Sequence, residues 1–291
     1  MRISKSLHRF IEQSAWHAEA ALIEGRKALD EKLPDTDQFY TWVVLSSICG
    51  DLAGAGWSTD EEDAGSTPLS KKEMEHAIAA QDYAEKALAV YPDHSSAATL
   101  SEHIQWHIQQ AYINLANSKW VRGQYEDAIQ VYEGARAIDF RLGYLLCQIT
   151  AIMSQQQQYD RIITTAQSWN TLQRSNWLAL NEQDDDYVHE VFQKAAKKTG
   201  KEEFMVQAYQ ELITILDLDG NAAILRFRLA SAYRSVLRND EEAKRVLNEI
   251  LDGTTCKDPV TGEEDEFMVF RANKDACRNY LRSISQIYQI Q

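Results

Sequence analysis

The chain has 291 residues, of which 44% are hydrophobic and 10% aromatic, so it can bury the core of one large domain or two ordinary ones. Its 30 basic and 44 acidic residues give a net charge of -14, which excludes nucleic-acid binding unless basic residues are segregated into a patch, and no such patch is found. Only 12 Gly and 4 Pro are present, and helix-forming residues are common. The composition therefore indicates a mostly helical protein.

The cysteines and the apolar segments indicate a compartment. Four cysteines lie far apart with no C-x-x-C spacing, which suits a reducing environment better than a disulfide framework or a zinc site. No window approaches the roughly 18 to 20 apolar residues of a membrane helix. A secretory signal requires an apolar region near the N-terminus. Here charged residues and histidines interrupt the segment before such a region forms. We therefore expect a protein of the cytoplasm or nucleus that does not contact a membrane.

The first 110 residues contain helical patterns and one long insertion. Small residues at helical spacing span 21–28 weakly and 80–87 clearly. Residues 42–49 have the spacing of the first helix of a pair, with Trp42, Leu45, Ser46 and Cys49 on one face. Between 42–49 and 80–87, residues 54–73 are acidic and rich in turn formers, which predicts an exposed loop that is dispensable for folding.

The clearest pattern is the stretch "YINLANSKWVRGQYEDAIQVYEGARAIDF", residues 112–140. Tyr112, Leu115, Ala116 and Lys119 share one helical face before a break at Gly123. A second face follows, formed by Ala128, Tyr132 and Ala135. Two antiparallel helices that cross closely need small residues at their contacts, so the small residues predict a tight helix pair joined by a short turn.

The face of the second helix recurs further along the chain. It is found at Ile162/Ala166/Trp169, Met205/Tyr209/Leu212 and Ala243/Leu247/Ile250. First-helix spacing precedes it at 146–153 and 226–233, whereas the unit around Met205 has a poor first helix. Polar loops are expected at 181–186 and at 253–266.

The 112–140 unit resembles the tetratricopeptide repeat, whose pattern is W-x2-L-G-x2-Y, then A-x3-F, then P, over about 34 residues. Ala116 replaces the Gly of the pattern, Lys119 its Tyr and Phe140 its Pro. The resemblance implies an all-α fold: a right-handed α-solenoid of about five degenerate helix pairs with terminal capping helices, in one domain that covers residues 1–291. First-helix spacing at 281–288 has no second helix after it, so either this helix caps the array or the chain is a segment of a longer protein.

In this family the first helices line a concave groove, and the resemblance therefore implies candidate binding residues. We expect Asn114 and Asn117, about one turn apart, to hold the backbone amides of an extended peptide, with Lys119 and Arg122 near the turn. The alternative interpretation is a solvated polar face. Some members of the family bind a partner's C-terminal carboxylate with Lys, Asn and Arg of their first helices, and Arg228 stands at the place of such an arginine. A further candidate is Trp57 in the polar loop, which either anchors a ligand or holds the loop against the domain.

Two other patterns are similar to metal-binding motifs, and for both an interpretation without a metal is preferred. His103 and His107 lie one turn apart beside Glu102, but they have no third ligand and are interpreted as polar helix surface. The run Asp184 to Asp186, with Glu190, resembles the aspartate-rich magnesium motif of terpene synthases, but a second metal motif is missing. An acidic start of a helix explains this run more simply.

The sequence thus favours a scaffold or adaptor without catalytic activity, which needs neither cofactor nor metal. Its expected ligand is a protein or peptide that is neutral or basic, because the chain is strongly acidic. It could serve as the recognition part of a larger signalling protein. The alternative is an all-helical enzyme that uses carboxylates and magnesium.

Overall fold

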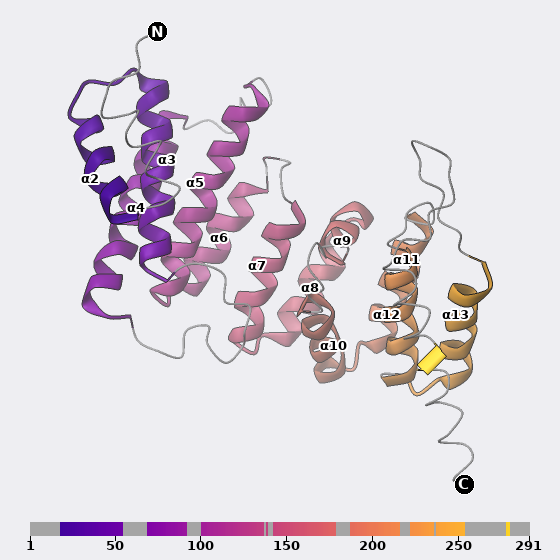
Figure 1. Cartoon of the computed structure of the whole chain (residues 1–291). Coiled ribbons are helices and arrows are strands. Elements are labelled where there is room, and N and C mark those ends of the chain that lie inside the picture. The colour runs from indigo at the N-terminus through magenta and orange to yellow at the C-terminus, as the bar shows by residue number, and fades with distance from the viewer. Residues whose placement is uncertain are drawn as a thin grey trace. The chain divides into compact units, whose positions relative to one another are not determined.

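The computed structural model describes residues 18–54, 69–91, 100–136, 138, 142–178, 187–215, 222–235, 237–253 and 278–279. Every regular element among these residues is an α-helix, which confirms the all-α class (Figure 1). The chain divides into two compact units, an N-terminal unit of Met1–Gln155 and a C-terminal unit of Gln156–Gln291.

The N-terminal unit contains six described helices. They are α2 (Ala18–Leu29), α3 (Asp35–Leu52), α4 (Lys71–Val90), α5 (Glu102–Val121), α6 (Tyr125–Ala135) and α7 (Leu142–Gln155). A capping box fixes the start of α4: the Ser70 hydroxyl accepts from the backbone N–H of Glu73, and the Ser70 N–H donates to the Glu73 carboxylate at 2.6 Å. Residues 71–73 are therefore helical and not part of the expected loop, of which residues 55–68 lie outside the described part of the chain.

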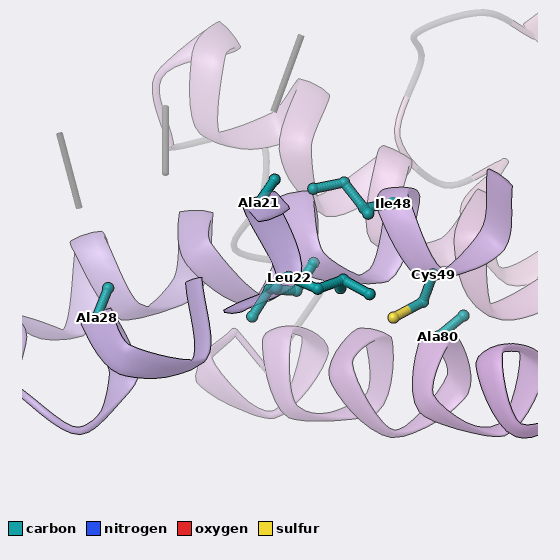
Figure 2. Packing of buried hydrophobic residues seen from close by; sticks show 7 residues of the cluster. Ala21, Leu22, Ala28, Ile48, Cys49 and Ala80 are labelled. Atoms are coloured by element: carbon teal, nitrogen blue, oxygen red, sulfur yellow. The ribbon is translucent and has the colours of Figure 1, made fainter. Parts of the chain in front are cut away.

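Side-chain contacts give the directions of these helices. The α3 and α4 pair is antiparallel, because Phe39 lies 4.9 Å from Tyr91 while Cys49 shares a cluster with Ala80 (Figure 2). The α5 and α6 pair is antiparallel as well, since Lys119 pairs with Asp127 and the earlier Asn117 with the later Tyr132.

Like helices of neighbouring pairs run parallel. Lys72 of α4 pairs with Glu19 of α2 at 2.5 Å, and Tyr83 of α4 bonds to Arg26 of α2, so the contacts advance along both helices together. The same holds for α3 and α5. Tyr40 of α3 packs on the start of α5, and Ser46 and Ser47, further along α3, bond to Asn114, further along α5.

The C-terminal unit also contains six described helices. They are α8 (Tyr159–Ser168), α9 (Thr171–Leu178), α10 (Tyr187–Thr199), α11 (Glu202–Ile215), α12 (Ala222–Ser235) and α13 (Asp240–Gly253). The sequence did not predict α9, a short helix that inserts Trp177 between Trp169 and Phe192, with ring centroids 5.2 and 5.0 Å away. Of the other expected elements, residues 181–186, 254–266 and 281–288 lie outside the described residues, while Gly253, expected to begin a loop, is the last residue of α13.

One turn geometry recurs in both units. Gly123, Gln157, Gly200 and Arg238 all have left-handed backbone conformations, with φ of 75°, 56°, 65° and 53°. Each lies two residues before the start of a helix, α6, α8, α11 or α13. After the two glycines, the next N–H bonds back to a carbonyl five residues earlier, as in a Schellman motif: Gln124 to Lys119 and Lys201 to Ala196, each at 2.9 Å.

The buried residues follow the register expected from the sequence. Each left-handed residue lies five positions before the first member of a predicted small or apolar triplet, at Ala128, Ile162, Met205 and Ala243. All four of these side chains are buried, and Ala80, Ala84 and Ala87 of α4 are buried too. The predicted register of the second helices is therefore confirmed wherever their side chains are described. Figure 2 shows the same kind of contact where Ala21 and Leu22 of α2 meet α3.

Candidate functional site

Asn114 does not lie on an open surface. Its side chain is 6% exposed, and its amide nitrogen donates to Ser46 Oγ at 2.7 Å and Ser47 Oγ at 2.8 Å on α3. Its amide oxygen accepts from Gln110 at 2.9 Å. Contrary to the expectation of an exposed asparagine pair, Asn114 connects two parallel helices, because the face of α5 that carries it packs on α3.

Asn117 points away from Asn114, toward α6. Its amide oxygen accepts a hydrogen bond from the hydroxyl of Tyr132, a side chain that is fully buried. Burial, reinforced by Tyr144 and Cys147, raises the pKa of Tyr132 well above its usual value, so the hydroxyl stays protonated and donates. Asn117 thereby satisfies a buried donor, and its half-buried side chain has a structural partner.

Lys119 and Arg122 also have partners inside the N-terminal unit. Lys119 Nζ lies 3.8 Å from the carboxylate of Asp127 at the start of α6. Arg122 donates to the side-chain oxygen of Gln81 on α4, and Gln81 in turn donates to Glu85 at 2.7 Å. The three candidates on α5 and Arg122, which follows it, therefore face three different helices, and the structure does not gather them into one site.

The two remaining candidates are separate from α5. Arg228 lies on α12 in the C-terminal unit, where it is 5% exposed and donates to the carbonyl of Leu178 at 3.4 Å. Trp57 lies outside the described residues. A ligand-binding role for Lys119, Arg122, Arg228 or Trp57 stays a prediction.

The structure brings together a group of rings that the sequence did not single out. Tyr40 of α3 lies 4.6 Å from His107 and 5.3 Å from His103, both on α5. Trp106 lies 4.7 Å from His107, and the two imidazole centroids are 4.4 Å apart. We name Tyr40, His103, Trp106 and His107 the ring cluster. His103 is exposed and the other three are half-buried, so the cluster has a face that solvent reaches.

Burial keeps two members of the ring cluster, His107 and Tyr40, uncharged near pH 7. Burial lowers the pKa of His107, more than its hydrogen bond to the backbone oxygen of His103 raises it. Burial also raises the pKa of Tyr40, with smaller contributions from Tyr91 and Asp37. The expected polar surface at the histidines is thus wrong for His107, because Tyr40 and Trp106 pack against it. The cluster offers aromatic faces and imidazole nitrogen, but no activated nucleophile.

The sequence of neither helix, taken alone, indicates the ring cluster. Positions 103, 106 and 107 share a face of α5, but that face gains Tyr40 only because α3 and α5 run parallel with the start of one beside the start of the other. Parallel stacking of first helices is a tertiary feature. A search for aromatic residues at the starts of successive first helices would have found the pair.

Groups suited to other chemistry are scarce in the described part of the chain. There, no three His, Cys, Asp or Glu side chains are placed to hold a metal ion together. The aspartates 184–186 lie outside this part, and Glu190 is exposed in the first turn of α10. Burial raises the pKa of the Cys49 thiol to about 11, so Cys49 is not a thiolate near neutral pH.

No model of a known protein family matches the chain, and no curated protein is significantly similar to it. Among the described helices, none is both long and apolar enough to cross a membrane.

Proposed function

We propose that the chain is a tetratricopeptide-like α-solenoid that acts as a non-catalytic scaffold for a protein or peptide ligand. The observation that carries the proposal is the recurring turn. In each copy a helix starts two residues after a left-handed residue, and a buried residue lies five positions after that same left-handed residue. Such regularity is expected when each helix pair must stack on the next to bury its apolar face. The parallel arrangement of α3 with α5, and of α2 with α4, supports the same interpretation.

The binding surface that we infer is the ring cluster together with the adjoining first-helix faces of α3 and α5. Tyr and Trp are among the residues enriched at binding hot spots, and Tyr40 and Trp106 both pack on His107. The acidic chain favours a ligand that is neutral or basic. A reducing compartment, the cytoplasm or nucleus, fits the buried free thiols Cys49 and Cys147.

The experiment begins with the intact chain as bait in an extract of its source cell, followed by binding measurements with the purified ligand. Tyr40→Ala and Trp106→Ala should each weaken binding at least about tenfold, a loss typical of hot-spot aromatics. Ile78→Ala is the matched control, because Ile78 is an exposed apolar residue on a second helix, α4, with 52% of its surface accessible.

Loss of binding in Ile78→Ala with no loss in Tyr40→Ala or Trp106→Ala would place the ligand on the second helices and contradict the proposed surface. Circular dichroism of each variant should show unchanged helix content. If the intact chain captures no ligand above the level of an unfolded control, the scaffold function itself is contradicted.

A further inference from the structure

His103 and His107 share one face of α5, one turn apart, and their ring centroids are 4.4 Å apart. Two imidazoles that hold one ion at about 2.1 Å and at roughly a right angle have ring centres roughly 4.6 Å apart. The observed separation of the ring centroids is close to this value, with an angle of 70° between the ring planes. Right angles between ligands are typical of the tetragonal sites that bind Cu²⁺ and Ni²⁺.

The tautomer of His107 is suited to metal binding. Its Nδ1 lies 2.7 Å from the backbone oxygen of His103, and because a carbonyl oxygen only accepts, Nδ1 must carry the proton. The lone pair of His107 is therefore on Nε2, which makes no hydrogen bond to any described residue. A hydrogen bond from the second ring nitrogen to a backbone carbonyl is the usual support of a metal-binding histidine.

The surroundings of the pair keep the site ready to bind. Tyr40 packs against both imidazoles and Trp106 against His107, so the orientation of the His107 ring is fixed before any ion arrives. The exposed His103 can adjust to meet the ion.

We propose that His103 and His107 form a two-histidine chelate for a divalent late transition metal ion, preferring Cu²⁺ and Ni²⁺ to Zn²⁺. The pair supplies two adjacent coordination positions, and water fills the others, because the described residues provide no third protein ligand. The ion spans one turn of α5, so it binds the folded helix and not the unfolded chain. The site lies within the ring cluster, but ion binding does not require the scaffold function.

The test is a calorimetric titration of the untagged, full-length chain with NiCl2 at pH 7.5. We expect one ion per chain, with an affinity that falls at least about tenfold in His103→Ala and in His107→Ala. Lowering the pH through about 6 should weaken binding, because protonated imidazoles do not ligate. His103 is exposed, and in His103→Ala the Tyr40 ring of α3 keeps its contact with His107 of α5.

Two controls separate a chelate from general histidine content. His76→Ala removes a histidine of α4 and should leave the affinity as in the wild type. Ser101→His combined with His103→Ala keeps the number of histidines but moves one off the shared face, at a residue whose side chain makes no capping bond; this variant should bind as weakly as His103→Ala. The proposal is overturned if the wild type shows no binding up to about 1 mM Ni²⁺, or if His103→Ala and His107→Ala bind as tightly as the wild type.

Discussion

The α5–α6 pair and the α10–α11 pair share a turn but differ in what fills the space between their helices. Both are joined by a left-handed glycine, Gly123 or Gly200, and closed by the same backward hydrogen bond. Between α5 and α6 the buried contacts include alanines. Between α10 and α11 they include Phe192 and Tyr209, with ring centroids 6.2 Å apart.

The two pairs nevertheless retain one polar contact in common. In each, a buried tyrosine on the second helix, Tyr132 or Tyr209, hydrogen-bonds a first-helix side chain, Asn117 or His189. The comparison teaches that turn geometry and buried register recur, while the side chains that fill the contact can change. This explains why the sequence of the α5–α6 pair resembles the tetratricopeptide pattern more than the sequence of the α10–α11 pair does.

The largest loss of stability is expected in the α10–α11 pair, whose helices meet through aromatic side chains. Phe192→Ala should lower the free energy of unfolding by about 3–5 kcal/mol, because Phe192 is fully buried and contacts Trp177, Phe204 and Tyr209. Urea unfolding followed by tryptophan fluorescence would measure it. Phe192→Leu, the control, should cost clearly less. A loss below about 1 kcal/mol for Phe192→Ala would mean that this contact does not hold the pair together.

In the α5–α6 pair, stability should be lost because side-chain volume is added and not because it is removed. Ala128→Leu should destabilise the chain by about 1–3 kcal/mol, because the added side chain overpacks a fully buried contact. Gln130→Leu, at an exposed position of the same helix, is the matched control. Equal stability of the Ala128→Leu variant and the wild type would reject the close helix contact.

Asn114→Ala tests whether Asn114 is structural. We expect a loss of about 1 kcal/mol, at the low end for a buried hydrogen-bonding group, because Ser46 and Ser47 keep their own bonds to the Val43 carbonyl. Thermal unfolding measures it. Ser101→Ala, at a helix start without a side-chain cap, should change stability less. Unchanged stability of Asn114→Ala together with weakened ligand binding would restore Asn114 as a ligand-binding residue.

Two substitutions at left-handed turn residues should change stability by smaller amounts and in opposite directions. Gly123→Ala should cost about 0.5–1 kcal/mol, because φ is 75° there and a side chain strains that conformation even though no atom lies near its Cβ. Gln157→Gly, at the equivalent position of another turn, should leave stability unchanged or raise it slightly. If Gly123→Ala stabilises the chain, the left-handed turn is not required.

The smallest effect concerns pH. Burial lowers the pKa of His107 in the folded chain, so the unfolded chain binds more protons and stability falls as the pH drops below about 6.5. His107→Phe keeps a ring in the cluster and should lose less stability than the wild type between pH 7 and pH 5. His76→Phe is the control. Equal slopes for His107→Phe and the wild type would show that His107 does not titrate abnormally.

How much could be predicted depended on whether a feature is local. The second helices were predicted in register because their small residues repeat at helical spacing, as Ala128 and Ala135 do. Asn114 was misplaced because the sequence does not show which face of α5 meets α3. The ring cluster needs both helices at once. The short α9 was missed because it is eight residues long and too brief for a periodic pattern.

Hydrogen exchange of the full-length chain, with and without the ligand recovered from the cell extract, tests the scaffold proposal most directly. The scaffold account predicts that the ligand slows exchange in the first halves of α3 and α5, around Tyr40 and Trp106, and leaves α4 and α6 unchanged. Slower exchange confined to α2, α4 or α6, with no change in α3 and α5, would contradict the account.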